Sequence, residues 1–350
     1  MSRILITGSA GFIGGWLANE LCNWGHDVVG IDDFSGGLPD NVDERTEFYR
    51  LDLTAPGTES FVANLECDIV VHTSCSPHEG LSVHSPIRIA SKSTVSVFQN
   101  VLVGAINGGC KRFVNFDSMA KYGDAGGTPP PFSEDAQRTP QDPYGAAKLY
   151  TEYQTRILCD LHGISWVSLT PHNVYGDSFR MYTEDKSCRG GMNLSDPYRQ
   201  VLGIFCSRML RGLPPIVYGD GLQKRSPSYI GNCIDPMIEA IFNDDISGEC
   251  INIGELRHVT MLDFCRMVMD SFGWKEGCIH APDRPGEVKN AYCTVDKSVR
   301  LLGYEDKVSL EEGIDRTVRW SKQLGPKKLR YLEYYEISNL VPRVWKDRMM

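Results

Sequence analysis

Residues 3–14 read RILITGSAGFIG, and this stretch decides the fold class. Its first five residues are a short apolar run that suits a buried parallel strand. Gly8, Gly11 and Gly14 follow, and a stretch of helical length, Gly11–Trp24, begins among them. Glycines at such a turn let the backbone approach a pyrophosphate, which then lies at the helix N-terminus. The stretch therefore predicts the strand, turn and helix of a dinucleotide-binding unit.

Further short apolar runs alternate with stretches long enough for helices. In the first helical stretch, Leu17, Leu21 and Trp24 are expected on one buried face. Strand–helix alternation predicts an α/β fold with a Rossmann-type, doubly wound parallel sheet. The remaining strands are expected at Asp27–Ile31, Asp68–His72, Arg112–Phe116 and Trp166–Leu169.

The pattern changes after residue 177. We expect residues 1–177 to bind the cofactor and residues 178–350 to form mainly a smaller C-terminal α/β substrate lobe. Ser178–Pro197 is polar and glycine-rich, which indicates a long loop. Residues 230–255 are expected to return to the main sheet, through a strand at Glu249–Ile253. Helices are predicted at Val201–Arg211, Ile234–Asn243, Met261–Phe272 and Leu310–Leu324.

The composition excludes several classes of protein. A net charge of −9 argues against a nucleic-acid partner. No signal peptide or membrane span is expected, which predicts a cytoplasmic protein. The 12 cysteines occur singly, as buried reduced thiols would. His72, His78 and His84 are spaced by six residues, which matches neither a helix nor a strand, so no metal site is expected.

Asp32 ends the second predicted strand, where a carboxylate accepts hydrogen bonds from the adenine ribose. A negative charge there repels a 2′-phosphate, so the sequence favours NAD over NADP. Asp33 adjoins this acceptor, and Asp52 and Leu53 are expected to flank the adenine.

Tyr144 and Lys148 lie four residues apart at the start of a predicted helix, and therefore share one face. A nearby ammonium lowers the pKa of a phenol, which could then take a proton from a sugar hydroxyl. Ser118 follows the predicted strand Arg112–Phe116 and can hydrogen-bond the same oxygen. These three residues are the predicted catalytic group.

The motifs TGSAGFIG, SMAKYG, PYGAAK, HNVYG, GDGLQKR and RPGE occur in the order typical of extended short-chain dehydrogenase/reductases. Over nearly its whole length the chain resembles the NAD-dependent nucleotide-sugar epimerases of that superfamily, in particular the UDP-glucose 4-epimerase group. The resemblance implies that Asn173, Arg225, Arg284 and Glu287 hold the nucleotide-diphosphate sugar, together with Ser118. The residues expected at the cofactor are Gly8, Gly11, Phe12, Ile13, Gly14, Asp32, Asp33, Asp52, Leu53, Thr73, Tyr144 and Lys148.

The chain departs from the family pattern at four places. His72 is followed by Thr-Ser-Cys rather than by small apolar residues, and Pro77 replaces a frequent lysine. Thr94 stands where the family usually has asparagine, and Thr170 where it usually has arginine. These changes put individual cofactor contacts in question more than the catalytic group.

Dehydratases and decarboxylases of the superfamily carry an acid next to the catalytic Ser or Thr, whereas this chain has Met119 and Ala120. Neither can transfer a proton, which favours epimerisation at C4 through a transient 4-keto sugar. A dehydratase, a reductase or another epimerase is the alternative, and a catalytically silent NAD-binding regulator is a second.

Two finer expectations also follow from the resemblance. Ala291 is expected at a position that gates the space around the sugar C2 substituent, so N-acetylhexosamines should be accepted, although Tyr292 is its neighbour. The helices expected at Ser91–Ile106 and Tyr144–Ile157 should pair across a two-fold axis in a homodimer. Val95, Leu102 and Leu149 supply apolar residues to that interface.

Overall fold

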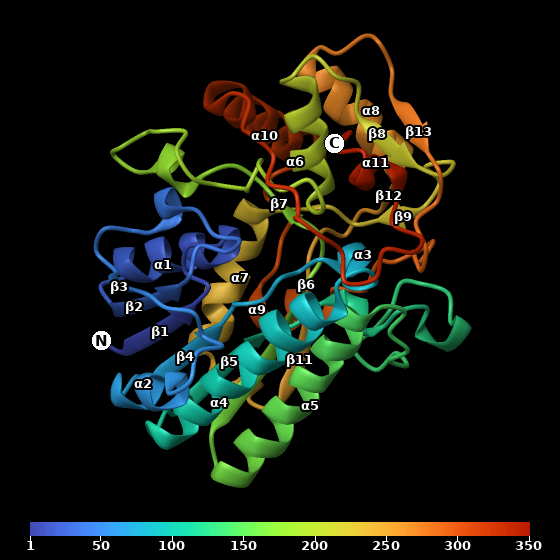
Figure 1. Ribbon diagram of the computed structural model, residues 1–350. Coiled ribbons are helices and arrows are strands. Elements are labelled where there is room, and N and C mark those ends of the chain that lie inside the picture. Colours follow the sequence, from blue (N-terminus) through green and yellow to red (C-terminus); the bar gives the residue numbers. More distant parts are fainter.

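The computed structural model describes residues 1–350 and contains a seven-stranded sheet, in which every neighbouring pair is parallel (Figure 1). The strand order is β11-β6-β5-β4-β1-β2-β3. The predicted fold class is confirmed. The strands are β1 (Arg3–Thr7), β2 (Asp27–Asp32), β3 (Glu47–Arg50), β4 (Ile69–His72), β5 (Arg112–Phe116), β6 (Ser165–Pro171) and β11 (Glu249–Ile253).

Helices cover both faces of this sheet. On one face α1 packs against α7, and on the other α2, α4 and α5 lie side by side (Figure 1). The helices of this domain are α1 (Phe12–Asn23), α2 (Thr58–Asn64), α4 (Val97–Asn107), α5 (Pro143–His162), α7 (Ile230–Phe242) and α9 (Asp296–Leu302).

The α1 helix corrects one expectation. Leu17 and Leu21 are fully buried, but Trp24 is 59% exposed. The helix ends at Asn23, so Trp24 lies beyond its buried face and instead stacks on Phe242.

The helix expected at Ser91–Ile106 begins earlier and is wider than an α-helix at its start. Residues Ile87–Ser96 form a π-helical segment that runs directly into α4. The hydroxyls of Ser93, Thr94 and Ser96 each donate to the carbonyl five residues earlier, which supports the wider turn. By length and composition Ile87–Asn107 could cross a membrane, but half of its most apolar window is buried inside the protein. It is a helix of the layer that covers one face of the sheet, together with α2 and α5.

The C-terminal part forms a smaller lobe beyond the carboxyl ends of the strands (Figure 1). The loop after residue 177 is irregular except for a short turn at Phe179–Tyr182, as predicted. Residues 325–342 run back across α3 to α11, where Trp345 is buried. The lobe contains β7 (Val174–Tyr175), α6 (Val201–Met209), β8 (Ile216–Tyr218), β9 (Lys224–Arg225), β10 (Ser228–Tyr229), β12 (Val259–Thr260), α8 (Met261–Phe272), β13 (Ile279–Ala281), α10 (Leu310–Leu324) and α11 (Arg343–Lys346), and α3 (Glu79–Ser82) faces it.

Candidate active site

The turn after β1 requires its glycines. Gly8 has a φ of +75°, and a Cβ there would lie 2.9 Å from Thr73 Oγ1. A Cβ on Gly14 would lie 2.2 Å from the carbonyl oxygen of Gly8, so the start of α1 can approach the turn only without a side chain. Thr73 Oγ1 donates to the carbonyl of Thr7 at 2.7 Å and closes the turn from β4. A phosphate group fits such a cradle at a helix N-terminus.

Asp32 lies at the carboxyl end of β2, beside this turn. Its carboxylate accepts from the backbone N–H groups of Ala10 at 3.2 Å and Phe34 at 2.8 Å. Burial raises the pKa of Asp32 to about 6, and the charge of Asp33 adds to the increase. A ribose that donates two O–H bonds suits this carboxylate, so the residues present fit a dinucleotide.

The other predicted cofactor residues surround the same end of the sheet. Asp33 accepts from the Ser35 N–H, and Asp52 accepts from the Thr54 N–H in the turn after β3. Leu53 is buried, and Phe12 and Ile13 begin α1. Their contacts with a dinucleotide remain predictions.

Tyr144 and Lys148 are one turn apart on α5, and both are buried. Asp142 caps this helix by accepting from the Gly145 N–H at 2.9 Å, and Pro143 occupies its first position. Lys148 Nζ donates to the carbonyl of Phe116 at 2.6 Å and lies 5.9 Å from the centre of the Tyr144 ring.

Burial outweighs the expected effect of Lys148 on the pKa of Tyr144. Burial raises the pKa of Tyr144 well above its ordinary value, and the thiol of Cys75, 3.8 Å from the phenol oxygen, adds to the increase. The ammonium of Lys148 is bound to a carbonyl and does not offset burial.

Ser118 follows β5 and caps a short turn, Met119–Lys121, by accepting from the Ala120 N–H at 3.2 Å. Its hydroxyl lowers the pKa of Tyr144 and so opposes the effect of burial, which indicates that the two groups lie near each other. The fold therefore brings together Ser118, Tyr144 and Lys148.

A cavity adjoins Met119 and Ala120, immediately after Ser118, and contains the four residues predicted to hold the nucleotide sugar. Arg284 forms a two-point hydrogen-bonded pair with Glu287, at 2.6 and 3.2 Å. Arg225 Nη2 reaches the same carboxylate at 3.3 Å. Glu287 therefore aligns both guanidinium groups along one wall. The cavity is lined by Glu79, Gly80, Val83, Met119, Ala120, Gly123, Asp142, Asn173, Arg225, Arg284, Pro285, Gly286, Glu287, Val288 and Ala291.

Ala291 and Tyr292 have different surroundings. Ala291 lines the cavity, whereas the Tyr292 ring stacks on His258, with ring centres 4.2 Å apart and planes within 8°. Of the two adjacent residues, only Ala291 therefore lines the cavity.

Glu79 is a cavity residue that the sequence motifs did not identify. It begins α3 and lines the cavity with Asp142 and the two arginines. Removal of water by the surrounding protein raises the pKa of Glu79 to about 7, and Asp142 adds to the increase. The side chain keeps an exposed surface toward the cavity. It is a carboxyl group that could donate a proton, although no motif marks it.

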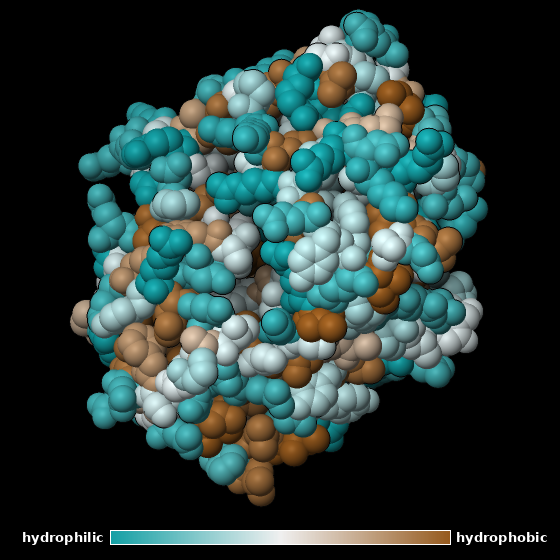
Figure 2. Space-filling model, viewed as in Figure 1, coloured by the Kyte–Doolittle hydropathy of each residue, from teal (hydrophilic) through white to brown (hydrophobic).

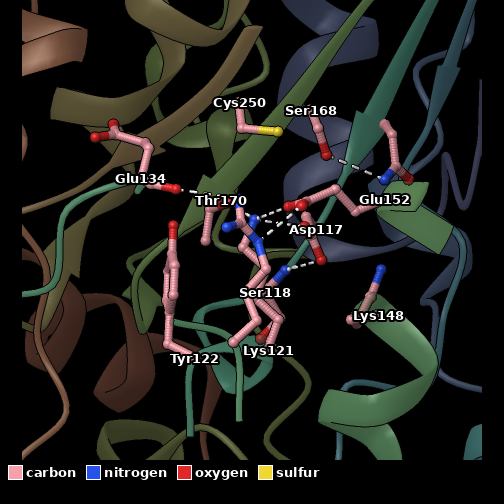
Figure 3. Close-up of polar contacts among 12 residues, drawn as sticks. Asp117, Ser118, Lys121, Tyr122, Glu134, Lys148, Glu152, Ser168, Thr170 and Cys250 are labelled. Carbon is pink, nitrogen blue, oxygen red and sulfur yellow. Dashed lines mark hydrogen bonds and ion pairs between the residues drawn. The ribbon is translucent and has the colours of Figure 1, made fainter. Parts of the chain in front are cut away.

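Two of the family departures have structural explanations. Thr94 is buried and bonds to the carbonyl of Ile89 within the π-helical segment. Thr170 Oγ1 accepts from Lys121 Nζ at 2.9 Å, inside the group of buried charges drawn in Figure 3.

A parallel sheet with a dinucleotide turn after its first strand, and a Tyr-x-x-x-Lys helix between β5 and β6, defines an extended short-chain dehydrogenase/reductase. The model of the NAD-dependent epimerase/dehydratase family matches residues 4–254, and the chain belongs to this family. Its cofactor is NAD, as the sequence predicted.

Among curated proteins, the chain is 26% identical to a putative UDP-glucose 4-epimerase of Methanocaldococcus jannaschii, over 91% of this chain and 98% of that protein. It is 27% identical to a UDP-N-acetyl-alpha-D-glucosaminuronate decarboxylase of Bacillus cytotoxicus, over 92% and 98%. Among solved structures, UDP-glucose 4-epimerase of Thermotoga maritima with UDP-glucose has a TM-score of 0.81 at 28% identity, covering 92% of this chain and 99% of that one. The Thermus thermophilus UDP-glucose 4-epimerase complex with NAD has a TM-score of 0.81 at 27% identity, covering 91% and 99%. The resemblance read from the motifs is confirmed.

Proposed function

We propose that the protein inverts C4 of a nucleotide-diphosphate hexose, either a UDP-glucose/UDP-galactose pair or a UDP-N-acetylhexosamine pair. The observation that carries the proposal is a cavity that Arg225 and Arg284 line together with Met119, Ala120 and Asp142, which stand within two residues of Ser118 or Tyr144 in the chain. A diphosphate held by the arginines leaves its sugar to reach the phenol. Domain roles follow: residues 1–177 bind NAD, and residues 178–350 mainly hold the substrate.

Each catalytic residue has one task in this proposal. In its ionised form Tyr144 takes the proton of the C4 hydroxyl, and it later returns this proton. Ser118 hydrogen-bonds the same oxygen and orients it. Lys148, fixed by the Phe116 carbonyl, places its positive charge beside the phenol as charge develops there. Bound NAD supplies the reversible oxidation of C4 and is regenerated in each turnover.

The test is incubation of the NAD-loaded protein with UDP-glucose and with UDP-N-acetylglucosamine, followed by NMR of the product. The proposal expects the C4 epimer, with an unchanged mass, from at least one of them. Conversion of neither substrate would overturn the assignment of a UDP-hexose.

Dehydration is the second candidate, because Glu79 lines the sugar cavity with a pKa near neutrality. Such a carboxyl can protonate a leaving hydroxyl. A product lighter by one water, lost in Glu79→Gln, would establish this reaction instead of epimerisation.

We further propose a homodimer. Tyr153, Ile157 and Leu161 recur every four residues along α5 and are 49%, 54% and 74% exposed. Val103 of the neighbouring α4 is 40% exposed, and Figure 2 shows apolar side chains at the lower end of the molecule, where these helices end in Figure 1. Leu102 is buried in the hydrophobic core of the same chain, so the expectation that it contributes to the dimer interface is wrong.

We also place the protein in the cytoplasm. All 12 cysteines are free thiols, which a reducing compartment preserves.

A further inference from the structure

A lysine is buried close behind the catalytic residues. Lys121 ends the turn that begins at Ser118, and its side chain has no exposed surface. Its Nζ donates to Asp117 Oδ2 at 2.6 Å, to Thr170 Oγ1 at 2.9 Å and to a carboxylate oxygen of Glu152 (Figure 3). A buried cation with three oxygen partners is fully hydrogen-bonded, and it joins segments that are distant in the sequence.

Two of these partners belong to the catalytic elements. Asp117 directly precedes Ser118, and its second carboxylate oxygen accepts from the Ser118 N–H at 2.8 Å. Glu152 lies on α5, one turn after Lys148 and on the same face. The ammonium of Lys121 therefore connects the backbone of Ser118 to the helix that carries Tyr144.

Lys121 is one of the two cations that hydrogen-bond the carboxylates of this group. Arg138 Nε donates to Glu152 at 2.9 Å, so two cations face two carboxylates. Burial raises the pKa of Asp117, whereas Lys121 and Arg138 lower the pKa of Glu152 even though burial opposes that change. Without Lys121, Arg138 and the more distant Lys148 would remain, and neither donates a hydrogen bond to Asp117. Uncompensated buried charge of this kind drives segments apart or forces a proton onto one carboxylate.

The contact with Thr170 explains the fourth departure from the family. The usual arginine at that position is absent, and the ammonium of Lys121 lies against the hydroxyl that replaces it. The cation that pairs with Glu152 is therefore Lys121, from the turn after β5, instead of an arginine at position 170 on β6.

We propose that Lys121 is a positioning residue, which fixes the separation of Ser118 from Tyr144 by holding Asp117 and Glu152 together. The inference rests on the catalytic roles proposed for Ser118 and Tyr144. If this proposal is correct, a positive charge supplied by an arginine at position 170 should replace the ammonium of Lys121 in holding Asp117 and Glu152 together.

The experiment compares Lys121→Met, which keeps most of the side-chain volume, with Lys121→Ala/Thr170→Arg, which removes as many side-chain heavy atoms as it adds. Misplacement of catalytic groups by a fraction of an ångström to about 1 Å costs up to about a hundredfold. We expect kcat of Lys121→Met to fall by about tenfold to a hundredfold, with KM changed by less than about threefold. The double variant should return kcat to within about threefold of the wild type.

A measurement independent of turnover separates this proposal from the proposed function. Hydrogen exchange of Lys121→Met should accelerate in residues 117–121 and in the first turns of α5, with no change in α2. If no nucleotide sugar is converted but exchange changes locally in this way and is restored in the double variant, the positioning role stands and the proposed function fails. Wild-type kcat in Lys121→Met, uniform acceleration across the protein, or a folded double variant without recovery would overturn the positioning role. If Lys121→Met does not fold, the double variant alone decides.

Discussion

Asp32 is a buried carboxylate at the position where we expect the cofactor ribose to bind. Its carboxylate is ionised above a pKa of about 6 and neutral below it. We expect the ionised form to accept both ribose hydroxyls and to repel a 2′-phosphate, so that cofactor choice depends on the protonation state of this residue.

The first prediction is a pH-dependent choice between cofactors. Between pH 7.5 and 5.5, the ratio of NADP to NAD dissociation constants should fall, because the neutral acid loses the repulsion. Asp32→Ala should weaken NAD binding and remove the pH dependence of this ratio. Fluorescence titration with both cofactors measures it, and Glu44→Ala, which removes an exposed carboxylate elsewhere, is the matched control. A ratio independent of pH in the wild type, with unchanged NAD affinity in Asp32→Ala, would assign the ribose to another residue.

The second prediction concerns the phenol. Tyr144→Phe should reduce kcat by about 10²–10⁴-fold while NAD and nucleotide-sugar binding stay nearly intact, because only proton transfer is removed. Tyr153→Phe, on the exposed side of the same helix, should keep full activity. Retention of more than about a tenth of the rate in Tyr144→Phe would be incompatible with general acid–base catalysis at this residue.

The third prediction concerns the sugar. Ala291 lines the cavity, so the wild type should accept UDP-N-acetylhexosamines, and Ala291→Tyr should lower kcat/KM for them relative to UDP-hexoses through steric overlap. Tyr292→Phe should leave the ratio unchanged, since that ring stacks on His258 outside the cavity. If the wild type rejects acetylated sugars, or if the ratio of kcat/KM values is unaltered in Ala291→Tyr, residue 291 does not control the space around the sugar C2 substituent.

At the scale of elements, the sequence predicted the helices and strands whose ends are marked by a local pattern of apolar residues. β5 and β11 have their predicted bounds, and so do α8 and α10, because each is an apolar or amphipathic run with clear ends. β3 was missed, since its four residues lie at the sheet edge and none is buried. The π-helical start of α4 was not predicted, because the residues of this segment are those of an ordinary helix. Its wider turn depends on hydroxyl-to-carbonyl hydrogen bonds that only the folded chain shows.

The fourth prediction belongs to α5. Ile157→Asp places a charge in the exposed apolar stripe and should convert a dimer into a monomer at micromolar concentration. Val299→Asp, at a 44% exposed position on α9, is the matched control and should leave the dimer intact. Light scattering distinguishes the species. A wild-type monomer, or an Ile157→Asp dimer, would show that this stripe is not the interface.

At the scale of the whole molecule, the candidate site is assembled from segments far apart in the sequence. Gly8, Asp32, Ser118 and Tyr144 could be predicted because each lies in a motif or at a strand end. Glu79 and Lys121 could not, since their importance comes from neighbours that only the folded chain provides. For the same reason, no pattern in the sequence indicates that burial outweighs the effect of Lys148 on the pKa of Tyr144.

The acidic chain, with its net charge of −9, places two arginines in one cavity. This local charge makes a diphosphate the expected anchor and leaves the sugar free to present either face after oxidation at C4. Epimerisation of this type moves hydrogen between the sugar and bound NAD without exchange with water.

The most direct measurement is turnover of the accepted nucleotide sugar in D₂O, with the product examined by NMR and mass spectrometry. The account predicts the C4 epimer with its carbon-bound hydrogens retained and its mass unchanged, and no such product from Tyr144→Phe. Deuterium bound to a sugar carbon, or a product lighter by one water, would contradict epimerisation at C4.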